Sequence, residues 1–254
     1  MDGIDSVVHC GARASQGRGA CRPALPRRQH YGHAAPGAFR GQGGRALIHL
    51  RQHCARPWPQ QRGPGSVQRG RNPDPARPYG MSKAAAEAGL KTPARECDLK
   101  ISVIRPPLVY GAGAKGNFAL LTRAVNLGLP LPFAAIRNHR AFLAVQNLSS
   151  FILRRLGNSD SASNFEVFLA ADEEQVSTPV FIERLANAFG KSPRLFGMSS
   201  KLLSSLLVVL GRQDTHDSLI GSLELDISKA IATGWQPDVS LDEGLRLALT
   251  AQDD

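Results

Sequence analysis

Strand and helix patterns alternate along this chain after Pro78, and this alternation constrains the fold more than any other feature. The β-branched run Ile101–Tyr110 is followed by a helix pattern over Asn117–Leu127, and Phe165–Ala170 is followed by another over Thr178–Phe189. A regular alternation of strands and helices is typical of an α/β domain with a parallel sheet. The sequence therefore predicts this fold class.

The same periodicities predict the remaining elements. Ser177 or Thr178 is the expected N-cap of the helix that follows it. The strongly apolar helix pattern over Lys201–Leu210 is too short to span a bilayer. The expected elements are strands over Ser6–Cys10 and Phe142–Val145, helices over Tyr79–Cys97, Leu148–Leu156 and Lys201–Leu210, and a tail, Asp226–Leu249, with a short helix, a turn and a closing helix.

The segment from Ala14 to Arg71 follows neither period. Between Arg13 and Pro78 the chain has 13 Arg, no Lys and one acid, whereas the remaining residues carry 18 basic and 20 acidic side chains. The net charge of +10 therefore belongs to one segment. At face value it is a disordered basic region that could contact RNA or DNA phosphates. Against nucleic-acid binding, its aromatic residues are isolated and it has no lysine.

Composition excludes several other classes. No run of 18 apolar residues exists among the 254, and the N-terminus starts with acids, so neither a membrane span nor a signal peptide is expected. Four cysteines (Cys10, Cys21, Cys54 and Cys97) form no CxxC pair, which argues against a structural metal site or a disulfide framework. We expect a cytoplasmic protein with no metal and no membrane partner.

The stretch PYGMSKAAAE, Pro78–Glu87, carries the chemistry. On a helix Tyr79 and Lys83 share one face. An ammonium beside a phenol lowers the phenol's pKa from about 10. The phenol can then act as a general acid or base toward a sugar or alcohol hydroxyl. The lysine can also donate to the ribose hydroxyls of a nicotinamide cofactor. The spacing alone equally fits a solvated helix pair.

Context extends this motif to a family. With VVHCGAR before it and RPPLVYG after it, the stretch resembles the extended short-chain dehydrogenase/reductases, the NAD-dependent nucleotide-sugar epimerases and dehydratases. The resemblance covers Asp2–Arg13 and Pro73 to the end. It implies a Rossmann-like sheet, with Tyr79 and Lys83 catalytic and in contact with NAD or NADP. It also implies cofactor contacts at Gly11, Ala12 and Pro106.

The resemblance extends to the substrate side. RNHRAFLAV resembles the region where an arginine meets the nucleotide diphosphate, which implies this role for Arg140 through bidentate binding. The alternative interpretation is that Arg140 is an ordinary surface arginine exposed to solvent. KGNFALLTRAVNLGLPLPF most resembles enzymes acting at carbon four of UDP-linked amino sugars, which implies a substrate contact at Asn117. The tail GWQPDVSLDEGLRLAL matches the family's closing stretch.

Gly111–Gly116 fits GxGxxG, the pattern of dinucleotide-binding loops. It follows the Tyr/Lys helix, whereas the family's dinucleotide loop opens the first strand, and no acid stands about twenty residues further on. We interpret it as a substrate-side loop.

Two features of the family are missing. Its first three strands and glycine-rich loop would precede residue 1, and the helix and Ser/Thr-ended strand expected before Tyr79 are absent as written. Synonymous codons for Arg28–Gly37, read from the second base, give Val-Asn-Thr-Thr-Gly-Thr-Leu-Arg-Leu, and Ile48–Cys54 gives Ser-Ile-Phe-Val-Ser-Thr. These are the missing motifs. Our hypothesis is therefore a frameshifted insert over about Ser15–Arg71; a clean reading frame in the nucleotide sequence of the locus would contradict it.

The expected organisation has three parts: a remnant Rossmann strand (1–14), an Arg/Gly/Pro-rich irregular segment (15–72), and a region with the catalytic helix, the remaining Rossmann strand and a small α/β substrate-binding part (73–254). By descent we expect an epimerase, dehydratase or 4-reductase that binds a UDP-sugar and forms a homodimer. Little turnover is expected of this chain. The alternatives are a non-catalytic remnant and a basic nucleic-acid-binding protein.

Overall fold

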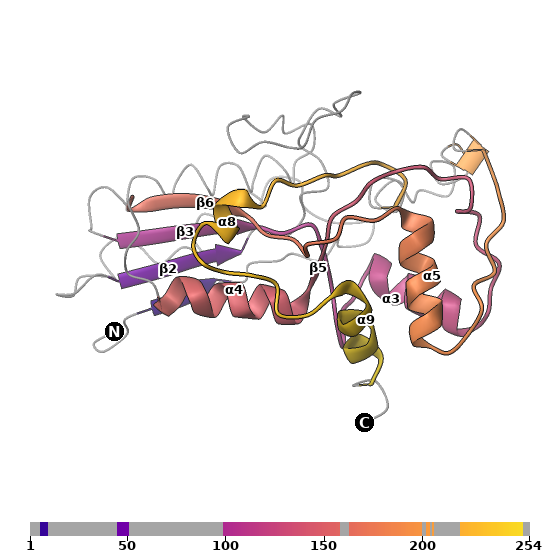
Figure 1. Cartoon of the computed structure of the whole chain (residues 1–254), viewed down its shortest axis with the longest axis horizontal. Coiled ribbons are helices and arrows are strands. Elements are labelled where there is room, and N and C mark those ends of the chain that lie inside the picture. The colour runs from indigo at the N-terminus through magenta and orange to yellow at the C-terminus, as the bar shows by residue number, and fades with distance from the viewer. Residues whose placement is uncertain are drawn as a thin grey trace, which may run out of the picture.

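The computed structural model of the chain describes residues 6–9, 45–50, 99–157, 163–199, 202, 203, 205 and 219–250. Four strands form one parallel sheet in the order β1-β2-β3-β6 (Figure 1). Neighbouring strands pair in register, with Val8 opposite Ile48 and Ile48 opposite Ser102. The strands are β1 (Ser6–His9), β2 (Arg45–Leu50), β3 (Leu99–Arg105) and β6 (Phe165–Leu169). The predicted parallel α/β fold is confirmed.

Strand β2 lies inside the segment that was predicted to be irregular throughout. The prediction is wrong at Arg45–Leu50, which pairs with β1 on one side and β3 on the other. A strand flanked on both sides in a parallel sheet needs no apolar and polar alternation, so the short run Ala46–Leu50 gave no period-two signal. The rest of the Arg-rich segment, and with it the question of a frameshift, lies outside the described residues.

The predicted strand Ile101–Tyr110 is two strands. The chain leaves β3 at Arg105, passes Pro106 and Pro107, and forms β4 (Leu108–Tyr110) in a separate two-stranded sheet. Its partner there is β5 (Phe142–Ala144), which runs parallel to β4. Proline has no backbone N–H to give to a neighbouring strand, so the Pro-Pro pair ends one ladder and lets the chain enter another.

The predicted helices in the described part of the chain are confirmed, with ends that differ by a few residues. Ser177 is the N-cap of α5, and its hydroxyl accepts a hydrogen bond from the Val180 N–H. The helix predicted at Lys201–Leu210 is described only at residues 202, 203 and 205, and the one at Tyr79–Cys97 lies outside the described residues. The helices are α3 (Asn117–Asn126), α4 (Val145–Gly157), α5 (Thr178–Ala188), α8 (Ser228–Ile231) and α9 (Leu241–Thr250).

Two apolar clusters hold these elements together. One joins the sheet to α4 and contains Phe151, Phe168 and Trp235. The other fills the helical lobe, which we define as α3, α5 and α9 together with β4 and β5. There Phe142 of β5 stacks on Phe181 of α5 with ring centroids 4.0 Å apart.

The parallel sheet and the helical lobe lie end to end (Figure 1). The arrowheads of the sheet point toward the lobe, so the carboxyl ends of its strands face β4 and β5. In open α/β sheets ligands bind outside the carboxyl ends of the strands. This junction is therefore where a site is expected. Within the described residues no helix has both the length and the apolar character needed to cross a membrane.

Candidate functional site

Three of the predicted site residues belong to the described part of the chain. Pro106 is buried directly after β3, Asn117 is the first residue of α3, and Arg140 lies just before β5. Pro106 thus lies at the carboxyl edge of the parallel sheet, Asn117 begins a helix of the lobe, and Arg140 pairs through its backbone with Val176. The predicted catalytic pair Tyr79 and Lys83, and the predicted cofactor contacts Gly11 and Ala12, lie outside the described residues.

The loop Gly111–Gly116 connects β4 to α3. It is a tight turn in which the Ala114 N–H donates to the Gly111 carbonyl, and Gly113 and Gly116 have positive φ angles of 67° and 76°. The loop follows a strand of the two-stranded sheet, not a strand of the four-stranded one. This position supports a substrate-side loop instead of a dinucleotide loop, which opens the first strand of a Rossmann sheet.

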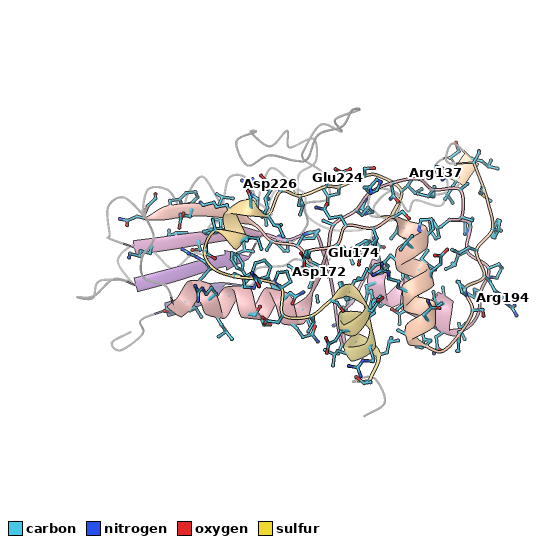
Figure 2. The ribbon with its side chains drawn as sticks, in the orientation of Figure 1. Arg137, Asp172, Glu174, Arg194, Glu224 and Asp226 are labelled. Carbon is cyan, nitrogen blue, oxygen red and sulfur yellow. The ribbon has the colours of Figure 1, made fainter. Side chains whose placement is uncertain are left out.

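A buried carboxylate, Asp172, is bonded to Tyr110, the residue that precedes this loop. It accepts hydrogen bonds from the Tyr110 hydroxyl (2.8 Å), the Ala144 N–H (3.0 Å) and the Asn147 side-chain amide (2.7 Å). Asn147 in turn binds the backbone of the tail, donating to the Val239 carbonyl and accepting from the Val239 N–H. We call these five residues the Asp172 cluster. In Figure 2 Asp172 lies between the parallel sheet and α9.

Burial dominates the electrostatics of the Asp172 cluster. Removal from water raises the pKa of Asp172 above its usual value, although the hydrogen bonds from Asn147, Ala144 and Tyr110 oppose the shift. Burial raises the pKa of Tyr110 as well, and the neighbouring Asp172 carboxylate raises it further. The Tyr110 hydroxyl therefore keeps its proton and serves as a donor. Because the donors come from β4, β5 and α4, the cluster fixes the strand end from which the Gly111–Gly116 loop starts.

Glycine is needed at two points around this cluster. A Cβ atom at Gly111 would lie 2.4 Å from Val145 Cγ1, and one at Gly244 of α9 would lie 2.7 Å from the Tyr110 hydroxyl. Both approaches are shorter than van der Waals contact. Gly244 therefore lets α9 pack directly against the Tyr110 end of β4.

A second buried polar group surrounds Asn138. Its amide nitrogen donates to Thr178 Oγ1 (3.0 Å) and to the carbonyls of Leu219 (3.0 Å) and Gly221 (3.3 Å), and its amide oxygen accepts from the Thr178 N–H (2.9 Å). The guanidinium of Arg140 donates to the same Gly221 carbonyl. We call Asn138, Arg140, Thr178, Leu219 and Gly221 the Asn138 cluster.

Arg140 is not the solvated surface arginine that was the alternative interpretation. It is 2% exposed, because backbone pairing holds it between two other segments. Its N–H and carbonyl pair with Val176, and the next residue, Ala141, donates to the Leu223 carbonyl. Diphosphate binding by Arg140 stays a prediction. If Arg140 has this role, a buried guanidinium performs it.

Sequence reasoning missed Asp172, Asn147 and Asn138. A sequence signal for Asp172 does exist, since it stands two residues after the end of the buried strand pattern Phe165–Ala170, where parallel sheets place functional side chains. Asn138 stands within the segment quoted for Arg140. No sequence signal marks Asn147, whose partners lie 25 and 92 residues away.

The parallel sheet with helices against it, and the loops gathered at its carboxyl edge, define an α/β protein of the Rossmann type. Residues 1–171 match the model of the NAD dependent epimerase/dehydratase family. The chain belongs to this family, as its sequence motifs predicted.

Two curated relatives are 4-epimerases. The chain is 36% identical over 177 residues to UDP-glucose 4-epimerase of Vibrio cholerae, an alignment that covers 69% of this chain and 53% of that protein. It is 23% identical over 186 residues to N-acetyl-alpha-D-glucosaminyl-diphospho-ditrans,octacis-undecaprenol 4-epimerase of Escherichia coli O157:H7, covering 68% and 56%. The chain thus spans about half the length of the curated relatives it matches.

Solved structures show the same fold at low sequence identity. UDP-glucuronic acid 4-epimerase from Bacillus cereus in complex with NAD is 19% identical, with a TM-score of 0.70 over 99% of this chain and 75% of that one. UDP-N-acetylglucosamine 4-epimerase from the same organism is 17% identical, with a TM-score of 0.69 over 98% and 79%. These likenesses confirm the Rossmann-like fold.

Proposed function

We propose that this chain is built to bind a UDP-sugar for NAD(P)-dependent chemistry at carbon four of the sugar. The observation that carries the proposal is the family match over residues 1–171, which includes Tyr79 and Lys83, together with a 36% identical relative named as a UDP-glucose 4-epimerase. UDP-linked amino sugars are the preferred substrates, because KGNFALLTRAVNLGLPLPF resembles enzymes that act on them.

The proposed chemistry divides between Tyr79 and Lys83. Tyr79, with its pKa lowered by Lys83, takes the proton from the carbon-four hydroxyl. A bound nicotinamide cofactor would supply the acceptor for the hydride that leaves the same carbon and the donor of the hydride that reduces the resulting ketone. The sugar is thereby oxidised and then reduced, and return to the opposite face gives the 4-epimer.

The described residues fit a cofactor and a substrate at the junction. The carboxyl ends of β1, β2, β3 and β6 share one edge, and Pro106 stands at the end of β3 where its backbone would lie near the nicotinamide. We assign Gly11 and Ala12 to the cofactor, Asn117 to the sugar and Arg140 to the diphosphate. NAD and NADP both remain candidates. A homodimer in the cytoplasm, without nucleic-acid or membrane partners, completes the proposal.

The Ser/Thr hydroxyl expected beside Tyr79 has no counterpart in this sequence. β2 ends at Leu50 and is followed by Arg-Gln-His-Cys, and no Ser or Thr stands between Ser15 and Ser66. A missing hydrogen-bond donor to the reacting hydroxyl weakens general acid–base catalysis but not binding of the nucleotide. We therefore expect UDP-sugar binding with little or no turnover.

The test separates binding from turnover in the purified chain. Calorimetric titration with UDP-glucose, UDP-N-acetylglucosamine and ADP-glucose is expected to show micromolar binding of the UDP-sugars only, and the 4-epimer should stay near background over hours with NAD added. The matched control is Tyr79→Phe, which should leave binding unchanged. Absence of UDP-sugar binding would overturn the proposed function, whereas rapid epimer formation abolished by Tyr79→Phe would overturn only the expectation of low turnover.

A further inference from the structure

Asn138 joins three segments that are distant in the sequence. It lies next to α5 and to residues 219–221, and its side chain is 3% exposed. The amide nitrogen has two hydrogens for three acceptors, and the amide oxygen accepts from the Thr178 N–H, one of the N-terminal donors of α5 that have no partner within the helix. Every polar atom of this buried amide is therefore used.

The same amide is connected to Arg140 through one atom. The Gly221 carbonyl accepts hydrogen bonds from both the Asn138 amide and the Arg140 guanidinium. Asn138 also holds Leu219, two residues earlier in the same segment. The position of the carbonyl that orients the guanidinium thus depends on Asn138.

The backbone around Arg140 is fixed independently. The Arg140 N–H and carbonyl pair with Val176, and the two neighbours of Arg140, His139 and Ala141, pair with Leu223. Asn138 therefore has little influence on where the main chain of Arg140 runs. Its influence is on the Gly221 carbonyl and, through this carbonyl, on the direction of the guanidinium.

We propose that Asn138 is a positioning residue that orients Arg140 for the diphosphate of the nucleotide sugar, through the Gly221 carbonyl that both side chains share. The inference rests on the proposed function, since it assigns the ligand of Arg140. Bidentate binding of a phosphate depends on the plane of the guanidinium, so a displaced carbonyl weakens phosphate binding without changing the charge.

Asn147 provides a matched control. It too is a buried asparagine with four hydrogen bonds, to Asp172, to Asp238 and to both backbone groups of Val239. None of these four hydrogen bonds involves Arg140. Replacing either asparagine by alanine removes the same atoms from a buried, fully bonded site, so the two variants should lose similar stability.

The experiment measures the affinity of the purified full chain for UDP and for uridine by calorimetry. Asn138→Ala is expected to weaken UDP binding by about tenfold and uridine binding by less than about twofold. Asn147→Ala, at the same fraction folded, should change neither by more than about twofold. In an Arg140→Met background, Asn138→Ala should have no further effect on UDP affinity, because Asn138 acts on UDP only by orienting the Arg140 guanidinium.

A second variant covers the case in which Asn138→Ala fails to fold. Asn138→Asp keeps the size and the acceptor for Thr178 but loses the donor to Gly221, and it should weaken UDP binding at least as much. The inference is overturned if UDP affinity is unchanged in both Asn138 variants, or if uridine affinity falls as much as UDP affinity. It is also overturned if Asn147→Ala weakens UDP binding equally, or if the losses of UDP affinity in Arg140→Met and Asn138→Ala are additive. Absence of UDP binding by the unmodified chain would overturn the proposed function itself.

Discussion

The Asp172 cluster and the Asn138 cluster are built alike and differ in what their charge is bonded to. Each buries one charged side chain next to an asparagine with four hydrogen bonds. The Asp172 carboxylate accepts from a hydroxyl, a backbone N–H and an amide on three elements of its own fold. Arg140 donates to the carbonyl of Gly221, a neutral acceptor.

Under the proposed function, Asp172 is a structural charge and Arg140 is a charge that binds the nucleotide. Removing the hydrogen-bond partners of a buried charge strongly lowers the free energy of unfolding. A carboxylate with donors from β4, β5 and α4 therefore stabilises the junction of these elements. In the Asn138 cluster the charged group is a guanidinium, whose planar donors can bind a phosphate in a bidentate manner. We therefore expect substitutions in the Asp172 cluster to lower stability without changing UDP affinity, and those in the Asn138 cluster to lower both.

The largest effect is expected from Asp172→Ala. The substitution leaves the Tyr110 hydroxyl, the Ala144 N–H and the Asn147 amide buried without their acceptor, so the free energy of unfolding should fall by about 3–5 kcal/mol. Urea denaturation followed by circular dichroism measures it. A loss below about 1 kcal/mol would mean that water replaces the carboxylate and that the cluster is not structural.

Tyr110→Phe tests one bond of the same cluster. It keeps the ring that packs on Phe118 and Phe181 but removes the donor to Asp172. The free energy of unfolding should fall by about 1.5–3 kcal/mol, because a buried charged acceptor loses a hydrogen bond. The same urea titration reports it, and UDP affinity at a matched folded fraction serves as the control that should not change.

Gly244→Ala tests the packing around the cluster. The added methyl would lie 2.7 Å from the Tyr110 hydroxyl and 3.1 Å from Ala144 Cβ, so α9 must move away from β4 and β5. Overpacking of this kind costs about 1–3 kcal/mol of unfolding free energy. The exposed position Asp242 on the same helix, changed to Ala, provides a control expected to have little effect, and equal stability of the two variants would contradict the close packing.

The charge of Asp172 predicts a pH dependence. Since its pKa is raised in the folded state, the folded protein binds more protons than the unfolded chain, and stability should fall as pH rises from about 3.9 through the raised pKa. Asp172→Asn should lack this fall. Tyr110→Phe should move it to higher pH, because the Tyr110 hydrogen bond lowers the pKa of Asp172. Chemical denaturation across pH 3–8 measures the three curves; identical slopes for the original chain and Asp172→Asn would refute the raised pKa.

The smallest effect is expected from Arg184→Ala. Arg184 pairs with Glu174 at 2.5 Å on the surface, where the two side chains are 27% and 50% exposed. The hydrogen bonds that Arg184 donates to the Glu174 carboxylate raise the pKa of Arg184. Because solvent screens exposed pairs, the loss should still be below about 0.5 kcal/mol. Thermal unfolding with and without 0.5 M salt checks it. If Arg184→Ala lost as much free energy of unfolding as Tyr110→Phe, the expectation that buried charges contribute more to stability than exposed ones would be wrong.

Local patterns predicted much of the fold and part of the site. The helices over Asn117–Asn126 and Thr178–Ala188 were predicted within a residue or two, because amphipathic periodicity and an N-cap serine are local signals. The strand over Arg45–Leu50 was not, since a central parallel strand has no alternation to detect. Pro106, Asn117 and Arg140 were predicted as site residues from motifs, and all three lie in the described part of the chain. Their roles stay predictions.

The sequence by itself determined the α/β class, the family and the Tyr79/Lys83 pair as its candidate chemistry, because these follow from residue types at short fixed spacings. Only the tertiary structure decided that β4 leaves the parallel sheet to pair with β5, and that Asp172 and Arg140 are buried. Tyr110 meets Asp172 across 62 residues and Asn138 meets Leu219 across 81. Contacts at such separations leave no periodic signal, since they depend on how whole elements pack together.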